Sequence, residues 1–428
     1  MKSVKFKFFP LLALALLYSL GISLSSLDAQ TDDRIYILAV DWNADGSQIA
    51  AVGIRGGTDD GYIFVLDVTT GETLYRLETP YGGFATVAWS PDSRFIAVGG
   101  YDQTVKLIDL QSGEMVATLV GHRWVVDSLD WNSDGTRLVS SSSGDQQVIV
   151  WDATTYESTR RIEVSDIWVV AFSPDDRHIA LGGGPGLWLF PSVLMNRPQG
   201  SVREQYHYAS GYLGALAWSR DSTRIAFGNQ TFQPAAGERP NPQVVVMDSV
   251  NGAILSNFEI QQGKAIFSIA WSPDNEVIAA YGLDGSVSIW DVAKAIPLDS
   301  FPGNVDYIAR GLGFSPYGGR LAYGGSIPSD FATSAAAQTE GVDAVQALAN
   351  SGIQVVVPDA SLDRLNSIAQ QCVQDANSAE RAAPLTRQPV TESTLSDFVA
   401  TIETLAEDAI PPACRADLLA VAEAIRSR

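Results

Sequence analysis

The six residues VAWSPD at positions 87–92 set the pattern for most of this chain, because close variants of them return at regular intervals. Each copy has small or apolar residues, an aromatic residue, then Ser or Asn at a turn, and a short apolar run follows. The seven copies are VDWN (40–43), VAWSPD (87–92), LDWN (129–132), VAFSPD (170–175), LAWS (216–219), IAWSPD (269–274) and LGFSP (312–316). Their aromatic residues stand 41 residues apart at the closest, from Trp131 to Phe172, and 53 at the widest, from Trp218 to Trp271. Spacing of this kind is typical of four-stranded propeller blades rather than of helical repeats.

Further strands are predicted downstream of most of these aromatic residues, where β-branched and apolar residues form short runs. The runs are residues 63–67, 105–109, 148–152, 187–190, 244–248 and 287–291. Two of them end in Trp-Asp, at Trp151-Asp152 and Trp290-Asp291, and a Gly-His pair at 121–122 precedes the third aromatic residue. With these motifs the chain resembles the WD-repeat β-propeller family over residues 32–360. The resemblance implies an all-β, seven-bladed propeller, in the wider class of YVTN-type and quinoprotein-type propellers, that displays rigid loops to protein partners.

Three domains are expected: a signal peptide at 1–29, the propeller at 30–360 and a small α-helical C-terminal domain at 361–428. Blade seven is expected to contain an insertion at 326–352, rich in Ala, Ser and acidic residues and exposed to solvent, before its third strand at 353–357. The chain turns helical after that strand, so the fourth strand must come from elsewhere. In the WD-repeat family it usually comes from the N-terminus, which here is Thr31–Tyr36, and such closure removes the open sheet edges.

Apolar residues return with a helical period from Ser361 onward. The three predicted stripes are Leu362, Leu365, Ile368 and Cys372; Leu395, Phe398, Ile402 and Leu405; and Cys414, Leu418, Val421 and Ile425. Thr394 is expected to be the N-cap of the second helix, and Pro411-Pro412 to start the third. Cys372 and Cys414 are the two cysteines of the chain. In an exported protein we expect them to form a disulfide bond, and the alternative is a pair of buried thiols.

The first residues have the three-part pattern of a secretory signal peptide. Lys2, Lys5 and Lys7 precede an apolar run of about 17 residues, and a polar stretch ends at Ala29. The pattern predicts cleavage near Ala29 and an exported protein, periplasmic or extracellular. Leu27 is larger than the residue usually found three positions before the cut, so the alternative is an uncleaved N-terminal membrane anchor. No membrane contact is expected beyond this segment.

Charge and composition exclude several classes of function. Acidic residues outnumber basic ones by 49 to 28, a formal net charge of −21, and long-range repulsion opposes binding to nucleic acid. Three histidines and two cysteines are too few for multi-site zinc or iron–sulfur chemistry. The sequence has neither a nucleophile elbow nor a glycine-rich phosphate loop. We therefore predict no cofactor, no metal site and no enzymatic activity.

One group of residues needs two interpretations. His122 with Ser140, Asp145 and Trp151 resembles the buried hydrogen-bond network by which the WD-repeat family ties an outer loop to the strands. A hydrolase triad uses the same residue types, but Trp151 belongs to the network and a catalytic serine must be exposed to substrate. We therefore assign structural roles to His122, Ser140, Asp145 and Trp151, and to Trp290 and Asp291 in blade six.

The residue four positions before each repeated aromatic is expected to point toward the mouth of the central channel. These residues are Leu38, Ala85, Asp127, Trp168, Gly214, Phe267 and Arg310. Trp and Phe beside Arg are residue types that anchor protein interfaces. The candidate binding residues are therefore Trp168, Phe267, Arg310 and Asp127. The alternative is that Trp168 and Phe267 only plug the channel.

These predictions combine into an exported, non-catalytic platform that binds or scaffolds an unidentified protein partner. The first alternative is a propeller enzyme of the quinoprotein or lyase type, which would need clustered acids, histidines or metal ligands at the channel mouth. The second is a periplasmic envelope accessory protein. Such proteins share the Ser-Pro-Asp hairpin but usually lack the Trp-Asp strand found here. The sequence does not indicate an oligomeric state.

Overall fold

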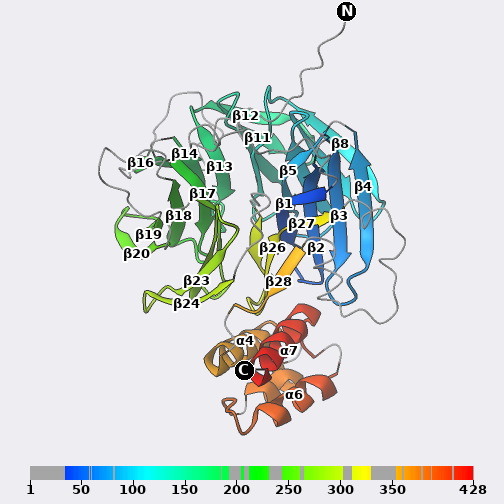
Figure 1. The fold of residues 1–428 in the computed structure, drawn as a ribbon, viewed down its shortest axis with the longest axis vertical. Helices are drawn as coiled ribbons and strands as arrows, with labels where there is room; N and C mark the ends of the chain where they lie inside the picture. The colour runs from blue at the N-terminus through cyan, green and yellow to red at the C-terminus, as the bar shows by residue number, and fades with distance from the viewer. Residues whose placement is uncertain are drawn as a thin grey trace, which may run out of the picture.

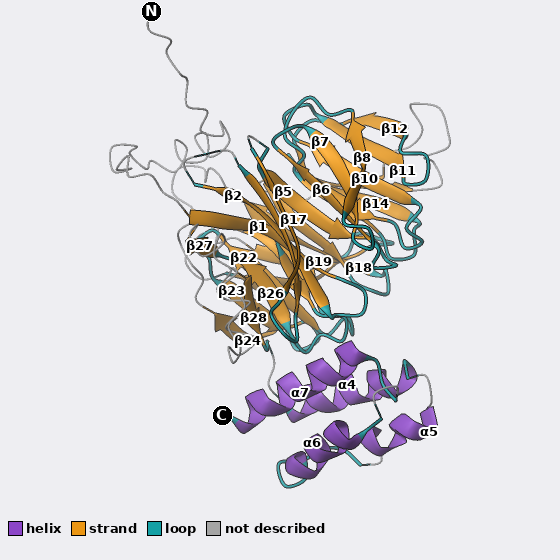
Figure 2. Ribbon diagram, turned by 90° about the vertical axis from the view of Figure 1, so that its right-hand side faces the viewer, coloured by secondary structure: helices purple, strands orange, loops and turns teal. Residues whose placement is uncertain are grey.

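The protein is a ring of seven β-sheets with a helical unit at one edge, next to blade seven (Figure 1). This computed structural model describes residues 34–427 except 57, 59, 81, 185, 192–203, 207–211, 231–242, 261–264, 302–310, 329–352, 359–360, 377–378, 387 and 407–408. Turned by 90°, the strands form one layered body and the helices a second, smaller one beside it (Figure 2). The seven-bladed propeller expected from the repeats is confirmed.

Blades one to four contain β1 (Arg34–Trp42), β2 (Gln48–Arg55), β3 (Gly61–Asp67), β4 (Thr73–Thr79), β5 (Phe84–Trp89), β6 (Phe95–Gly100), β7 (Thr104–Asp109), β8 (Glu114–Val120), β9 (Ser128–Trp131), β10 (Arg137–Ser142), β11 (Gln147–Asp152), β12 (Ser158–Glu163), β13 (Ile167–Phe172), β14 (His178–Gly183), β15 (Gly186–Pro191) and β16 (Glu204–Tyr206). Blades five to seven contain β17 (Tyr212–Trp218), β18 (Arg224–Gln230), β19 (Gln243–Asp248), β20 (Ile254–Glu259), β21 (Ile266–Trp271), β22 (Val277–Gly282), β23 (Val287–Asp291), β24 (Ile296–Phe301), β25 (Leu312–Phe314), β26 (Leu321–Gly324) and β28 (Ile353–Val356). The strand β27 (Ser326–Pro328) follows β26 in the chain but belongs to the sheet of blade one. Each strand that the sequence predicted downstream of a repeated aromatic is present.

The hydrophobic core lies between the blades. Blades two to six are antiparallel sheets of four strands in chain order, so each inner and middle strand has one face toward each neighbouring blade. One cluster joins Ile63 of blade one to Phe84 and Trp89 of blade two, and all three are almost fully buried. The outermost strands, such as β8, are mostly exposed. Burial therefore depends on the whole ring, because a single blade has no core of its own.

The inner strands share a β-bulge at one place in the repeat. Strand pairing skips one residue in each of five inner strands, and the skipped residues are Leu38, Ala85, Trp168, Gly214 and Phe267. These are the positions that stand four before each aromatic residue. A bulge releases one residue from the alternation of the strand and redirects its side chain. The position four residues before the repeated aromatic, which the sequence analysis selected, therefore coincides with a β-bulge in these five strands.

Ring closure differs from the prediction. Arg34–Tyr36 are not the fourth strand of blade seven; they are the start of β1, the inner strand of blade one. They pair on one side with β2 and on the other with β27. Ser326–Pro328, expected to begin an exposed insertion, form β27 instead. Residues 31–33 and 329–352 lie outside the described residues. A segment between the second and third strands of blade seven thus pairs with blade one, whereas the N-terminal segment was expected to pair with blade seven.

A repeated hydrogen bond also joins blade seven to blade one. The Trp42 indole donates to the Gly313 carbonyl oxygen at 2.9 Å. Trp131, Trp218 and Trp271 each donate in the same way to a carbonyl of the preceding blade. The seam where the chain closes therefore has the same indole bond as three of the internal blade contacts.

The C-terminal helices are α4 (Leu362–Gln374), α5 (Ala379–Ala382), the 3₁₀ turn η4 (Ala383–Thr386), α6 (Leu395–Thr404) and α7 (Pro412–Arg426). The three predicted helices are present, and α5 and η4 were not predicted. Thr394 is at the N-cap position of α6, but its hydroxyl bonds to Thr391 and does not cap the helix. Cys372 and Cys414 lie next to each other in the helical core, with Cα atoms 5.8 Å apart, as the expected disulfide bond requires. No helix among the described residues is long and apolar enough to cross a bilayer.

Candidate protein-binding face

A buried hydrogen-bond network holds the loop before the inner strand of blade three. His122 Nδ1 is 2.9 Å from an Asp145 carboxylate oxygen, and its Nε2 is 2.8 Å from Ser140 Oγ. The Trp151 indole donates to the same Oγ at 2.8 Å. The four side chains that the sequence grouped are therefore in contact, and they connect the loop to the two central strands of the blade.

Charge and burial settle how this network works. Burial lowers the pKa of His122, although Asp145 partly opposes the effect, so the ring is neutral at physiological pH. A neutral ring donates from Nδ1 to Asp145 and accepts the Ser140 hydroxyl proton at Nε2. Ser140 is fully buried, so no substrate could reach its hydroxyl. The network ties the loop to the strands, and its buried serine lacks the access that a hydrolase triad needs.

Blade six repeats only part of this network. Trp290 is buried and packs against Phe258, with ring centroids 5.5 Å apart. The strand register places Ala280 where blade three has Ser140, so the Trp290 indole has no serine hydroxyl there. Asp291 instead accepts the backbone N–H and the ammonium group of Lys294, both at 2.8 Å. Trp290 therefore acts through packing, and Asp291 fixes the following turn.

A second set of contacts makes the same loop of blade three rigid. Asp127 is buried, and its carboxylate accepts the backbone N–H of Ser143 at 2.8 Å and the Ser143 hydroxyl at 2.7 Å. Asp145 also accepts the backbone N–H of Arg123. The Trp124 ring packs against Gly144 so closely that a Cβ atom there would overlap it. The loop at 122–127 is thus tied to the turn at 143–145 at several points.

This rigid loop displays an exposed aromatic side chain. Trp124 is 41 % exposed, and Val120 at the end of β8 is 73 % exposed. Trp168, which is half-buried, lies at the same end of the neighbouring inner strand, because Ser128 Oγ and Val170 of the two strands are hydrogen bonded. We call Val120, Trp124 and Trp168 the blade-three face. An indole held in place before binding loses little conformational entropy when a partner covers it.

The other rim candidates lie differently. Phe267 is buried, with only 8 % of its surface exposed. The smaller Leu38 and Ala85 are also buried, at 4 % and 3 % exposed. The Asp127 carboxylate accepts hydrogen bonds from the backbone N–H and the hydroxyl group of Ser143. Arg310 lies outside the described residues. Trp124 was missed because it is not at a repeated position; its one signal was its place two residues after the Gly-His pair.

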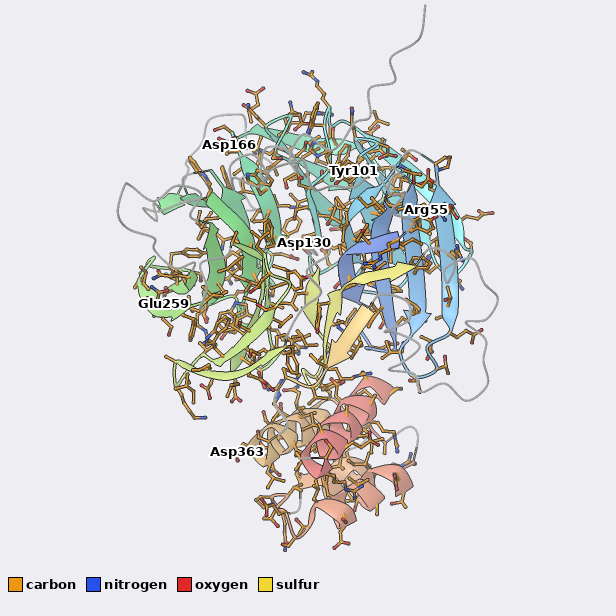
Figure 3. All side chains as sticks on the ribbon, viewed as in Figure 1. Arg55, Tyr101, Asp130, Asp166, Glu259 and Asp363 are labelled. Carbon is orange, nitrogen blue, oxygen red and sulfur yellow. A yellow bond between two sulfur atoms is a disulfide. The ribbon has the colours of Figure 1, made fainter. Side chains whose placement is uncertain are left out.

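Two inner strands each carry a carboxylate that bonds to the next blade, and Figure 3 labels one of them, Asp130, near the middle of the ring. Asp41 accepts the backbone N–H of Trp89 at 2.8 Å, and Asp130 that of Phe172 at 2.7 Å, so each bonds to the next blade. Burial raises the pKa of each carboxyl from 3.8 to about 7, and their mutual repulsion adds to the effect for Asp130. Both protonation states are therefore accessible near neutral pH.

This shift predicts a pH-dependent stability. The folded state holds the Asp130 proton more tightly than the unfolded chain does. The carboxyl therefore favours folding below its ordinary pKa, and that contribution is lost as the pH rises to about 7. Asp130→Asn keeps an acceptor for Phe172 but cannot ionise. Urea unfolding at pH 4 to 8 should show the variant gaining stability relative to wild type as the pH rises. A difference that stays constant across this range would contradict the assignment.

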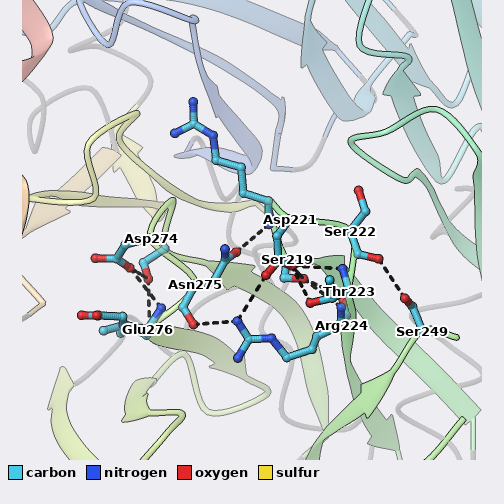
Figure 4. Close-up of polar contacts among 12 residues, drawn as sticks. Ser219, Asp221, Ser222, Thr223, Arg224, Ser249, Asp274, Asn275 and Glu276 are labelled. Atoms are coloured by element: carbon cyan, nitrogen blue, oxygen red, sulfur yellow. Dashed lines mark hydrogen bonds and ion pairs between the residues drawn. The ribbon is translucent and has the colours of Figure 1, made fainter. Parts of the chain in front are cut away.

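The opposite ends of the inner strands carry the repeated Ser-containing hairpins, shown for blades five and six in Figure 4. Ser219 Oγ donates to Asp221 at 2.6 Å, and the backbone N–H of Thr223 donates to the same carboxylate oxygen. The blades are also linked, because the backbone N–H of Arg220 donates to Asn275 Oδ1 at 2.7 Å. These side chains are occupied in holding hairpins and neighbouring blades together. Among the described residues, no group of His, Cys, Asp and Glu is arranged to hold a metal ion.

Comparison with known proteins agrees with this geometry. The family model "WD domain, G-beta repeat" matches residues 71–109, 113–152 and 254–291. Each match runs from the outer strand of one blade to the third strand of the next. The chain is 30 % identical over 174 residues to a WD repeat-containing protein of Schistosoma mansoni, SL1-17, covering 40 % of this chain and 52 % of that protein. It is 24 % identical to THO complex subunit 3 of Arabidopsis thaliana, covering 55 % and 71 %.

Solved structures show the same fold. The structure of U3-55K matches with a TM-score of 0.56 at 16 % identity, covering 68 % of this chain and 88 % of that one. A chain in the crystal structure of a mitotic checkpoint complex matches with a TM-score of 0.55 at 20 % identity, covering 70 % and 94 %. At these identities the likeness concerns the fold alone. The family match, with the seven sheets and the Trp-Asp strands, shows that the chain contains WD repeats within a seven-bladed propeller.

Proposed function

We propose that this protein is an exported, non-catalytic platform that binds a protein partner through the blade-three face. The observation that carries the proposal is Trp124, an indole that is 41 % exposed on a loop fixed by His122, Asp127 and Asp145. Exposed aromatic residues on rigid supports are the usual anchors of protein interfaces. Trp168, at the same end of the neighbouring inner strand, extends the same face.

Similar proteins support a protein partner. WD-repeat propellers typically serve as protein-interaction scaffolds, and one relative is named as a subunit of the THO complex. The chain covers only 52 % of the first relative named above, so the activity of the whole relative does not transfer. We extend to this chain only the general role of binding protein. Phe267, Arg310 and Asp127 remain proposed as secondary contributors at the channel mouth.

Export rests on two separate features. One is the Lys-rich start and apolar run that end near Ala29. The other is the Cys372–Cys414 pair, since disulfide bonds persist in oxidising compartments. Recovery of the chain outside the cytoplasm, with its N-terminus near Gln30, would support this part of the proposal. Recovery only from the cytoplasm would contradict it.

A photo-crosslinking side chain at position 124 tests the binding face. The control carries the same side chain at position 156, because Tyr156 is 39 % exposed and lies in the β11–β12 hairpin at the opposite end of the same blade. Irradiation of the producing cells should yield a covalent protein adduct at position 124 and none at 156. Adducts at 156 alone, or the same adducts at both positions, would place the binding surface elsewhere.

A further inference from the structure

The Ser-containing hairpins share one local arrangement in four blades. Serine donates to the aspartate two residues later, at 2.6 Å each in the pairs Ser90–Asp92, Ser173–Asp175, Ser219–Asp221 and Ser272–Asp274. The same carboxylate oxygen accepts the backbone N–H of the fourth residue after the serine, as at Arg94. The serine also accepts the N–H of the fifth residue, as at Phe95. A carboxylate is therefore a fixed part of this turn.

Blade seven lacks that aspartate, since Tyr317 occupies its position. Asp417 of helix α7 supplies the carboxylate instead. Ser315 Oγ donates to it at 2.6 Å, and the backbone N–H of Gly319, four residues after the serine, donates at 3.2 Å. The N–H of Arg320, five residues after the serine, donates to Ser315 Oγ as in the other blades. A residue about 100 positions away in the chain thus completes the seventh hairpin.

The negative charge of Asp417 is neutralised by an arginine side chain in the same contact between α7 and blade seven. Asp417 is fully buried, and the Arg320 guanidinium donates to it at 2.6 Å. Arg320 itself lies over the Trp42 ring of blade one, 4.9 Å from its centroid. A buried carboxylate that loses such a partner is strongly unfavourable. The contact therefore links the helical unit, blade seven and blade one.

Other contacts fix the helical unit in the same place. Arg364 of α4 is buried, donates to the Gly318 carbonyl oxygen at 2.9 Å and forms an ion pair with Asp274 of blade six. Helix α7 comes close to Gly46 of blade one, where a Cβ would stand 2.9 Å from that of Ala413. Gly46 also has a φ of +68°, which disfavours other residues. The helices therefore bridge blades six, seven and one, across the seam where the ring closes.

We propose that Ser315, Gly319 and Arg320 form a carboxylate-binding socket on blade seven, which the protein fills with its own Asp417 to latch the ring closed. The ligand class is a side-chain carboxylate. The other blades carry the equivalent carboxylate within the hairpin, so blade seven is where an element outside the hairpin supplies it. The C-terminal helical unit is accordingly part of the ring and not a loosely attached appendage.

Hydrogen–deuterium exchange of three proteins tests the latch. Asp417→Ala should increase exchange both in residues 315–320 and in α7, and should lower the melting temperature by about 5 °C or more. Adding Tyr317→Asp to this variant recreates the Ser-Pro-Asp sequence of the other blades. The double variant should regain protection in residues 315–320 while α7 stays exchangeable. Asp417→Ala with unchanged exchange in both segments would overturn the proposal, as would a double variant in which the hairpin is not restored.

Formate tests the ligand class, because it replaces the carboxylate that Asp417→Ala removes. Sodium formate should raise the melting temperature of Asp417→Ala relative to sodium chloride at equal ionic strength. It should leave wild type and the double variant unchanged, since their sockets are filled. Equal effects of formate and chloride on Asp417→Ala would overturn the assignment of a carboxylate socket. Each of these readouts is independent of partner binding, so the latch can fail while the proposed function stands.

Discussion

Trp151→Ala should reduce the free energy of unfolding by about 3–5 kcal/mol, the usual cost of deleting a buried indole. Trp151 is 2 % exposed, and its N–H donates to Ser140 at 2.8 Å. The substitution leaves a cavity and also removes one bond from the network that holds His122. Urea unfolding followed by circular dichroism measures the loss. A loss below about 1 kcal/mol would mean that the indole is not the core of blade three.

Trp290→Ala is the matched control for this prediction. Trp290 is 5 % exposed in the equivalent strand of blade six, but Ala280 replaces the serine there. The two substitutions delete the same side chain from similar surroundings, and only one of them breaks an indole–hydroxyl bond. Trp151→Ala should therefore cost more than Trp290→Ala by about 0.5–1.5 kcal/mol, the net value of a buried hydrogen bond. Equal losses would show that the network adds nothing to packing.

Loss of the Cys372–Cys414 bond should cost about 3–4 kcal/mol, because the bond closes a loop with a sequence separation of 42. Cys414 precedes Asp417 by less than one helical turn, so loosening the helical core should also loosen the latch on blade seven. Peptide mapping without reductant should find the two cysteines linked in exported material. Reduction should then lower the melting temperature.

The double variant Cys372→Ala, Cys414→Ala is the control for this second prediction. It should already melt at the lower temperature, and reductant should change it no further. Two free thiols in exported protein would contradict the disulfide. A melting temperature unaffected by reduction would contradict its contribution to stability.

The fold followed from the sequence because its main signal is periodic. Each Trp or Phe of the repeat, such as Trp89 or Trp131, must fill the space between two blades, so the sequence repeats wherever the geometry does. Ring closure was predicted incorrectly because the strand that closes the ring has no periodic signal in the sequence. Arg34–Tyr36 read as a strand, but nothing periodic distinguishes the start of an inner strand from a separate outer strand. The pairing of β27 with β1 depends on tertiary contacts that leave no repeat.

The candidate sites were likewise predictable only where a repeat or a family motif marks them in the sequence. The network of His122, Ser140, Asp145 and Trp151 was predicted because a family motif carries it. The positions expected to face the channel mouth coincide with β-bulges, which the sequence did not predict, and the burial of Phe267 depends on how neighbouring blades cover it. Trp124 and Asp417 lie outside the repeat. A single residue that acts across about 100 positions, as Asp417 does on Ser315, has no local sequence signal.

The most direct test of the central claim is the dissociation constant of the crosslinked partner for wild type, Trp124→Ala and Tyr156→Ala. An anchoring indole contributes about 2 kcal/mol or more, so Trp124→Ala should weaken binding by roughly thirtyfold while the protein stays folded. Tyr156→Ala removes an equally exposed aromatic residue from the opposite end of blade three and should bind like wild type. If Trp124→Ala binds as tightly as wild type, the blade-three face is not the binding site of this propeller.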